Sequence, residues 1–313
     1  MKPVPILITW DVDPDLWIAL EKRQKALHTA LDLCQQQGIR ATFFITAQGA
    51  EAYQDEFRAW QARGHEIGCH GLTHGNEENY DRMPANIQRT YIQEASEILR
   101  HLTGAPVRTF RGPRVKTSAH TLALLAEHGY LADSSVCSQR LDMVSSNLIN
   151  LGWLFAPRQP YHPHPANAFK KGDLPLWEMP ISAMIMPFIS TSLRVFGLGV
   201  MKALFRLLYY EARRTGQPIV YLAHPTEFLG RPNVDNWRNW REFVHPKYLT
   251  PSFIRANGFR PRNLFYRASG QKLVDYTRRL MTFMASFPQV EFMTVSEYIA
   301  KKDEVNPNHD PKP

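Results

Sequence analysis

Short apolar runs alternate with longer helical stretches along most of this chain, and no other feature limits its fold as strongly. Residues 6–10 predict the first strand, and residues 21–37 predict a helix that ends at Gly38. Further strands are predicted at 41–45, 66–70, 109–111, 131–134, 176–179, 219–224 and 290–294, and further helices at 85–102, at 118–128 and from Ser296. Such an alternation predicts parallel strands with outer helices, in an open sheet or a barrel.

Polar residues stand where several of the predicted strands end. Asp11 and Asp13 follow the first strand, and His70 ends the third. Arg111 ends the fourth strand, and His224 ends a late one. In a parallel barrel the carboxyl ends of all strands lie on one rim, where active sites are built. We therefore expect these side chains, which come from both halves of the sequence, to converge.

Two motifs indicate a metal site on this rim. GHEIGCHGLTH places His70 and His74 four residues apart, a spacing that lets two imidazoles bind one metal ion. WDVDPD places Asp11 and Asp13 on the same side of an extended segment, where their carboxylates repel unless a cation or proton lies between them. One carboxylate with two imidazoles suits zinc or a neighbouring transition metal. Taken singly, the histidine spacing could arise by chance, and the aspartates could form a solvated turn.

Two further residues have the chemistry of a catalytic site. Arg111, in FRGPR, can orient a carboxylate through paired hydrogen bonds, whereas Arg114 is more simply explained as a surface arginine. His224, in YLAHPTEF, follows a buried strand and can serve as a general acid or as a hydrogen-bonded core histidine.

The composition is that of a globular protein without a disulfide framework. The 313 residues are 44% hydrophobic, which is enough to bury a full core. The three cysteines, Cys34, Cys69 and Cys137, are odd in number and form no CxxC pair. This argues against disulfides and against a cysteine-only zinc site.

The charge and hydropathy patterns exclude some classes of protein. The chain carries 37 basic and 29 acidic residues, a formal net charge of +8. The excess favours anionic partners, but the basic residues are spread without a run of five, so nucleic-acid binding is not expected. No secretory signal is visible, and the uncharged runs are shorter than the roughly 18 to 20 residues of a membrane span. We therefore expect a cytoplasmic protein.

We expect a single domain over residues 1–300 and a disordered tail at 301–313. Two segments, at about 137–218 and 229–270, match no motif and are expected to be insertions. The first contains an amphipathic basic stretch, which predicts helices packed on the barrel or, alternatively, peripheral membrane contact. The second is rich in aromatic residues and arginine, which suits a lid, a sugar-stacking wall or a contact in a homo-oligomer.

Six motifs together resemble those of the NodB-type polysaccharide deacetylases, carbohydrate esterase family four. They are WDVDPD, ATFFI, GHEIGCHGLTH, FRGPR, HGYLADSS and YLAHP, within about residues 6–136 and 219–228. The resemblance implies a distorted (β/α) barrel, a divalent metal ion, which we expect to be Zn²⁺, and a carbohydrate or sugar-derived substrate. The implied reaction is hydrolysis of the amide of an N-acylated amino sugar.

The resemblance also implies a role for each matching residue. The implied catalytic residues are Asp11 as general base, Arg111 as the residue that orients it, and His224 as general acid. The implied metal ligands are Asp13, His70 and His74, and the implied substrate contacts are Trp10, Pro113 and Asp133.

One motif departs from the commoner form of the family. The chain has Asp-Val-Asp where that form has two adjacent aspartates followed by glycine. This variant is similar to a branch that includes some peptidoglycan deacetylases, deformylases of lipid-linked aminoarabinose, and ureide amidases. Two alternatives to an amino-sugar deacetylase therefore stay open. One is an amidase or deformylase acting on a lipid-linked sugar or a small ureide, and the other is a non-catalytic, metal-containing carbohydrate-binding protein.

Overall fold

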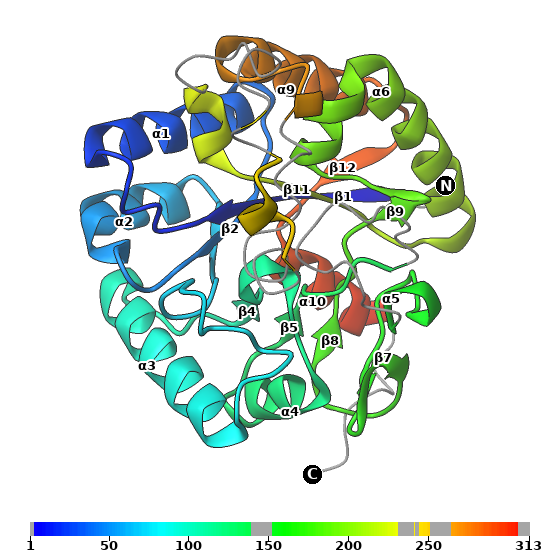
Figure 1. Cartoon of the computed structure of the whole chain (residues 1–313). Coiled ribbons are helices and arrows are strands. Elements are labelled where there is room, and N and C mark those ends of the chain that lie inside the picture. The colour runs from blue at the N-terminus through cyan, green and yellow to red at the C-terminus, as the bar shows by residue number, and fades with distance from the viewer. Residues whose placement is uncertain (1–2, 139–151, 231–240, 242–243, 251–263, 306–313) are drawn as a thin grey trace.

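A computed structural model describes residues 3–138, 152–230, 241, 244–250 and 264–305 of the chain. A curved parallel sheet lies at its centre, with helices arranged around it (Figure 1). The sheet consists of β1 (Val4–Val12), β2 (Thr42–Ile45), β3 (Glu66–Cys69), β4 (Thr109–Phe110), β5 (Ala132–Asp133), β8 (Trp177–Glu178), β11 (Ile219–Ala223) and β12 (Val290–Phe292). The helices are α1 (Leu20–Gln36), α2 (Gln54–Ala62), α3 (Ala85–Thr103), α4 (Ala119–Glu127), α5 (Gly152–Phe155), α6 (Ser190–Thr215), α9 (Gly270–Ala285) and α10 (Val295–Val305).

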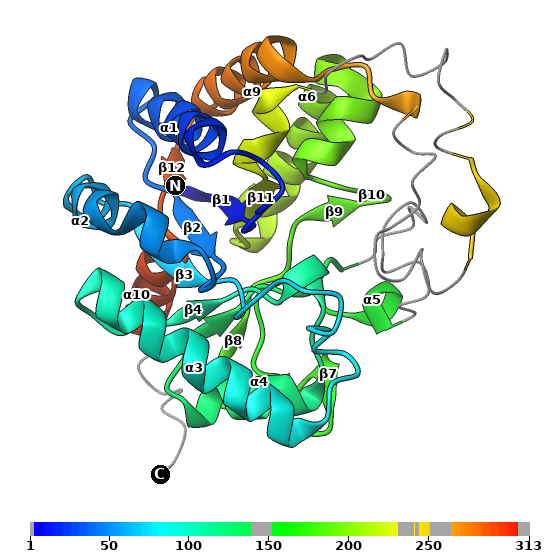
Figure 2. The same cartoon turned by 60° about the vertical axis from the view of Figure 1, so that its left-hand side comes forward.

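The strand order in the sheet is β11-β1-β2-β3-β4-β5-β8, and β12 pairs with the first residues of β1. Figure 2 shows α6 and α9 side by side on one flank, with α3 and α4 together on another. The parallel strands and outer helices confirm the predicted distorted (β/α) barrel.

The chain between β8 and β11 completes the barrel wall. It includes the short antiparallel pair β9 (Ala183–Met184) and β10 (Met186–Pro187). The backbone N–H of Ser182 donates to the carbonyl of Val220, and that of Leu222 donates to Phe188. These bonds attach the segment to β11. Irregular backbone therefore bridges β8 and β11, the two strands at the ends of the sheet.

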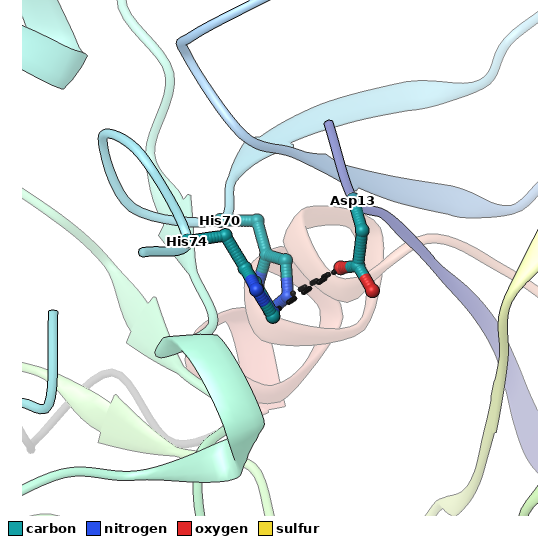
Figure 3. A group of neighbouring side chains, drawn as sticks. All are labelled: Asp13, His70 and His74. Atoms are coloured by element: carbon teal, nitrogen blue, oxygen red, sulfur yellow. Dashed lines mark ion pairs between the residues drawn. The ribbon is translucent and has the colours of Figure 1, made fainter. Parts of the chain in front are cut away.

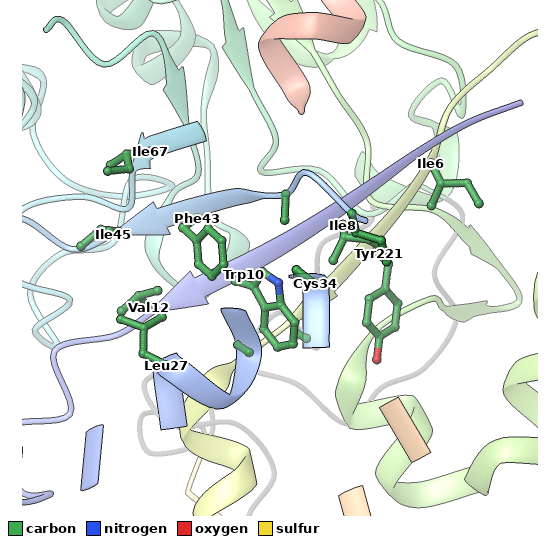
Figure 4. Packing of buried hydrophobic residues seen from close by; sticks show 14 of the residues in the cluster. Ile6, Ile8, Trp10, Val12, Leu27, Cys34, Phe43, Ile45, Ile67 and Tyr221 are labelled. Atoms are coloured by element: carbon green, nitrogen blue, oxygen red, sulfur yellow. The ribbon is translucent and has the colours of Figure 1, made fainter. Parts of the chain in front are cut away.

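Alternate residues of β1 face two different environments, because side chains of a strand point to opposite faces in turn. The even-numbered residues from Ile6 to Val12 lie in the main core between the sheet and the outer helices (Figure 4). Leu7 belongs to a second apolar cluster on the inner face of the sheet. Thr9 and Asp11 follow Leu7 at the same spacing, so β1 leads from an apolar interior to a polar rim.

Helix α10 covers the amino-terminal end of the barrel. The Glu66 carboxylate, at the start of β3, accepts hydrogen bonds from the hydroxyls of Thr42 and Thr109 at 2.8 and 2.9 Å. It also accepts the backbone N–H and the hydroxyl of Ser296 at 3.1 and 2.6 Å. One half-buried carboxylate thus binds two strands to the first turn of α10, where a negative charge is favoured by the helix dipole.

The prediction of a disordered tail from residue 301 is wrong at its start, because α10 continues to Val305. Tyr298 and Ile299 bury their side chains in the inner cluster and hold this helix against the sheet. Residues 306–313 lie outside the described ranges.

The predicted strands agree with the observed ones to within two residues at each end. The basic stretch expected to hold helices packed on the barrel forms α6, which buries one face against β11 and α9. Its other face exposes Phe196, Val200, Leu207 and Tyr210, and membrane contact there stays a prediction. None of the helices in the described ranges, α6 included, has the length and apolar content that a bilayer crossing requires.

Much of the aromatic segment at 229–270 falls outside the described residues, including Trp237 and Trp240. Within the described part, the guanidinium of Arg194 in α6 lies 3.8 Å from the centre of the Tyr266 ring. The proposed roles of this segment as a lid, a sugar-stacking wall or an oligomer contact stay predictions.

Candidate metal centre and active site

The carboxyl ends of β1 and β3 bring Asp13, His70 and His74 together, although Asp13 and His70 are 57 positions apart in the sequence (Figure 3). Asp13 Oδ1 lies 3.3 Å from His70 Nε2 and 3.4 Å from His74 Nε2. His70 is almost completely buried, whereas the side chains of Asp13 and His74 retain about a fifth of their exposure, 21% and 20%. The three groups therefore surround a point at the rim that is accessible from one side.

The hydrogen bond of His70 fixes which ring nitrogen faces this point. His70 Nδ1 lies 2.7 Å from the carbonyl oxygen of Arg111, and a carbonyl can only accept, so Nδ1 carries the proton. In a neutral ring the lone pair of Nε2 then faces the oxygens of Asp13 and, at 3.9 Å, of Asp11. Acceptors that face one another in a buried site require a proton or a cation between them.

A divalent cation fits the three donors. Ligand atoms about 2.0–2.1 Å from a tetrahedral zinc ion lie roughly 3.3 Å apart, which is close to the two observed distances. Among the described residues, buried Asp13 Oδ1 accepts no hydrogen bond. Burial would raise the pKa of Asp13, but His74, His70 and His224 outweigh it and hold that pKa well below its ordinary value. Asp13 is therefore ionised, and its Oδ1 could bind a cation.

Asp11 lies beside this centre and is paired with Arg111. Arg111 Nη1 donates to Asp11 Oδ1 at 2.9 Å and to the hydroxyl of Thr9 at 2.7 Å. Its Nε and Nη2 donate to the carbonyl and hydroxyl of Ser134 at 2.9 and 2.7 Å, and its guanidinium lies 4.4 Å from the centre of the Phe44 ring. Arg111 is fully buried, and its four hydrogen bonds fix the guanidinium in place. One of them, in place of the expected pair, holds Oδ1 of Asp11.

A second pair of carboxyl groups lies behind Arg111. Asp133 and Glu178 are fully buried, and Asp133 Oδ1 accepts the hydroxyl of Ser135 at 2.5 Å. Burial raises the pKa of Asp133 to about 6, and burial together with the Asp133 charge raises that of Glu178 well above its usual value. The two groups therefore favour a state that retains a proton.

His224 comes directly after β11 and precedes the 3₁₀ turn η3 (Pro225–Leu229). Its Nδ1 is buried and has no hydrogen-bond partner within the described ranges. Ala223, the last residue of β11, pairs with Trp10 of β1, so His224 and Asp11 follow at the same end of two neighbouring strands. The structure thus brings His224 to the same rim as Asp13.

The three predicted substrate contacts occupy different positions. Trp10 is fully buried in the main core, 6.3 Å from the Phe43 ring, because it points to the opposite face of β1 from Asp11 (Figure 4). This position does not support a substrate contact. Asp133 is also fully buried, behind Arg111. Pro113 packs against Gly71, next to His70, and its contact with substrate stays a prediction.

Two residues that sequence reasoning did not select also belong to the site. Arg114, interpreted above as a surface arginine, is half-buried and donates to the backbone carbonyls of His74 and Gly75 at 3.0 and 3.1 Å. Glu78 is fully buried in the loop that carries His74. Its place in the polar stretch GNEENYD gave no sign of burial.

Fold and site together define an α/β barrel with an Asp-His-His group on its carboxyl rim that could hold a metal ion. The model of one family, described as polysaccharide deacetylase, matches residues 1–132. The predicted resemblance to this family is confirmed over those residues.

Two curated proteins are similar to part of the chain. A peptidoglycan deacetylase of Helicobacter pylori is 28% identical over 106 residues, which cover 34% of this chain and 35% of that protein. A chitin deacetylase of Pestalotiopsis sp. is 30% identical over 103 residues, which cover 32% of this chain and 34% of that protein. The match thus spans about a third of the length of these relatives.

Solved structures are similar in fold over nearly the whole chain. A crystal structure from Mycobacterium smegmatis, of a protein assigned as a polysaccharide deacetylase, has a TM-score of 0.64 at 17% identity and covers 98% of this chain and 92% of its own. The PuuE allantoinase has a TM-score of 0.60 at 16% identity and covers 97% and 91%. These similarities show the fold of the chain.

Proposed function

We propose that this chain is a metal-dependent hydrolase that removes an N-acetyl or similar acyl group from an amino sugar or polysaccharide. One observation carries the proposal: the Asp13–His70–His74 centre lies beside an Asp11 carboxylate that Arg111 holds in a single orientation. A purely structural metal site needs ligands but no oriented carboxylate next to them. The deacetylase names of the H. pylori and Pestalotiopsis relatives support the same reaction class.

Asp13, His70 and His74 would hold the ion, and the donor set suits Zn²⁺. When bound, such an ion supplies Lewis acidity to the amide carbonyl and to the attacking water. Three protein ligands leave part of a tetrahedral shell for substrate, and the exposed sides of Asp13 and His74 give access to it.

Asp11 and His224 would move the protons of the reaction. Asp11, held by Arg111, accepts the proton of the attacking water as general base. His224 donates a proton to the departing nitrogen, because an amine leaves only when it is protonated. Arg111 fixes the position of Asp11 through their ion pair, so it acts through Asp11.

Acyl release from N-acetylglucosamine oligomers tests this proposal. We expect the purified chain to release acetate, to lose this activity on chelation, and to regain it with Zn²⁺. Asp11→Asn should lower turnover by about 100-fold or more, the range for loss of a general base. The matched control is Asp55→Asn, an exposed aspartate of α2, which should leave turnover unchanged. Retained turnover in the Asp11 variant would exclude Asp11 as the base.

The strongest alternative within the same reaction class is hydrolysis of a small ureide or of an N-formyl group on a lipid-linked sugar. It is supported by the Asp-Val-Asp motif and by the fold similarity to the PuuE allantoinase. Parallel assays on N-acetyl, N-formyl and ureide substrates separate these alternatives. Activity on a ureide with none on any glycan would replace the amino-sugar substrate.

The remaining alternative is a non-catalytic, metal-containing carbohydrate-binding protein. In this case the chain would bind oligosaccharides in the presence of Zn²⁺ but would turn over none of the three substrate types. Asp11→Asn would then change nothing in any of these assays, which distinguishes this protein from an enzyme.

A further inference from the structure

The second metal ligand, His74, stands on a loop with an unusual backbone. The loop follows β3, and Gly71 and His74 have φ angles of +77° and +56°. This left-handed region is readily adopted by glycine but is uncommon for other residues, so His74 needs interactions that hold it there. The position of the His74 imidazole depends on this backbone conformation.

The carboxylate of Glu78 supplies interactions of this kind. Its Oε1 accepts the backbone N–H of Leu72 at 2.7 Å and the hydroxyl of Tyr80 at 2.9 Å. Its Oε2 accepts the backbone N–H of Thr73 at 2.7 Å, the Thr73 hydroxyl at 3.0 Å and the backbone N–H of His74 at 2.6 Å. Glu78 is fully buried, so water cannot replace these five hydrogen bonds.

The carbonyl side of His74 is held as well. Arg114 Nη2 donates to the His74 carbonyl at 3.0 Å and to the Gly75 carbonyl at 3.1 Å, and Nη1 donates to the Glu78 carbonyl at 3.3 Å. The peptide groups on both sides of the His74 α-carbon are therefore fixed, one by a carboxylate and the other by a guanidinium. Charged groups make stronger hydrogen bonds than neutral ones, and they also favour a single geometry.

We infer that Glu78 is a positioning residue for the metal centre, and that together with Arg114 it preorganises the backbone of His74 for metal binding. This inference rests on the proposed function, because it assumes that His74 is a metal ligand. Glu78 would not touch the ion or the substrate, and it would act only through the position of His74. Groups that orient metal ligands change metal affinity by about 10- to 100-fold when they are removed.

The neighbouring residue provides a matched control. Glu77 belongs to the same loop and carries the same charge, but it is exposed, and its carboxylate accepts the Thr73 hydroxyl at 3.2 Å. Glu78→Gln replaces one accepting oxygen with an NH₂ group that faces N–H donors, whereas Glu77→Gln makes the same change in solvent. Any effect of charge alone should appear in both variants.

Co²⁺ binding to the metal-free full chain tests the inference, with the dissociation constant measured by chelator competition and the ligand geometry by the visible absorption spectrum. Glu78→Gln should weaken binding by about 10- to 100-fold and alter the spectrum, and Glu77→Gln should do neither. Arg114→Gln, which acts on the carbonyl side, should weaken binding in the same direction and serves if Glu78→Gln does not fold. Hydrogen exchange of the metal-free variants should show faster exchange at the His74 amide in Glu78→Gln alone.

The outcomes separate the two proposals. If Glu78→Gln binds Co²⁺ as tightly as Glu77→Gln, with the wild-type spectrum, Glu78 is not a positioning residue. The same result for Arg114→Gln would overturn the joint preorganisation of His74 by the two residues. In both cases the proposed metal centre still stands. If the wild-type chain binds no Co²⁺, the metal-dependent function fails and the inference that rests on it fails too.

Discussion

Replacement of Arg111 by methionine should destabilise the chain more than the loss of one hydrogen bond can explain. The guanidinium is fully buried and pairs with an Asp11 carboxylate that is 2% exposed. Methionine approximates the length of the arginine stem but carries no charge and donates no hydrogen bond. Removal of one partner of a buried ion pair costs about 3–5 kcal/mol, because the remaining charge stays in a medium that solvates it poorly.

The structure indicates which of the partners of Arg111 would be left unsatisfied. The Thr9 and Ser134 hydroxyls still donate to the carbonyls of Tyr221 and Met179 at 2.8 and 2.7 Å. The main loss is therefore at Asp11 and at the Ser134 carbonyl. We expect Arg111→Met to lower the free energy of unfolding by about 4 kcal/mol, within the range for a broken buried pair.

A double-mutant cycle in urea, with metal-free protein at neutral pH, measures this effect. Asp11→Asn in the Arg111→Met background removes the unpaired charge, so the double variant should recover about 2–3 kcal/mol relative to the sum of the two single variants. After metal is restored, turnover should be lowered by about 100-fold or more in both variants that lack Asp11. If the two single costs add to within about 0.5 kcal/mol, the buried ion pair does not stabilise the fold in the way we describe.

Three further predictions concern the buried carboxyl pair, the buried thiols and the proposed metal centre. In the folded chain the pKa of Asp133 is raised to about 6, and that of Glu178 is also raised. The free energy of unfolding should therefore fall as the pH rises from about 4 through 6, because the unfolded chain releases these protons first. The Asp133 shift alone accounts for about 3 kcal/mol. Glu178→Gln should reduce this loss in unfolding measurements across that range, and an unchanged pH profile would show that the pair does not share a proton. Burial raises the pKa of Cys34 and Cys69 to about 12, so both thiols should react with a disulfide reagent at pH 8 far more slowly in the native chain than in urea, and equal rates would contradict their burial. Zn²⁺ at 100 times its dissociation constant should raise the free energy of unfolding by about 2.7 kcal/mol, measured by thermal unfolding. His74→Ala should abolish this stabilisation. If the variant is stabilised as much as the wild type, the ion binds elsewhere.

The architecture of the sheet could be predicted from the sequence because its strands are buried on both faces. Runs such as that of β2 are apolar throughout and are bounded by polar breaks, and this pattern is typical of parallel strands covered by helices. Helix α2 was not predicted, because only Phe57 and Trp60 are buried in its nine residues. The pattern of α2 is too short to reveal a helical period.

The convergence of Asp11, Asp13, His70 and Arg111 was predicted correctly, because all four come directly from strand ends whose position the barrel determines. The same reasoning could not predict the burial of Glu78. It lies in an irregular loop, and its burial depends on the left-handed turns that bring three N–H groups around its carboxylate. No spacing rule describes such a loop.

Trp10 illustrates a different error. The resemblance implied a substrate contact at Trp10, but Trp10 and Asp11 are adjacent in a strand and therefore lie on opposite faces of the sheet. The family resemblance identified the correct segment, and the period of the strand decided which of its residues reach the rim.

The division of β1 into two faces has a consequence for attempts to change what the protein acts on. A deletion or insertion of one residue within the strand would exchange the two sets of side chains, placing the indole at the rim and the carboxylate under the helices. Changes of length within β1 should therefore be poorly tolerated. Variation in length and sequence is better tolerated in the rim loops that follow it, and libraries aimed at new substrates should be confined to them.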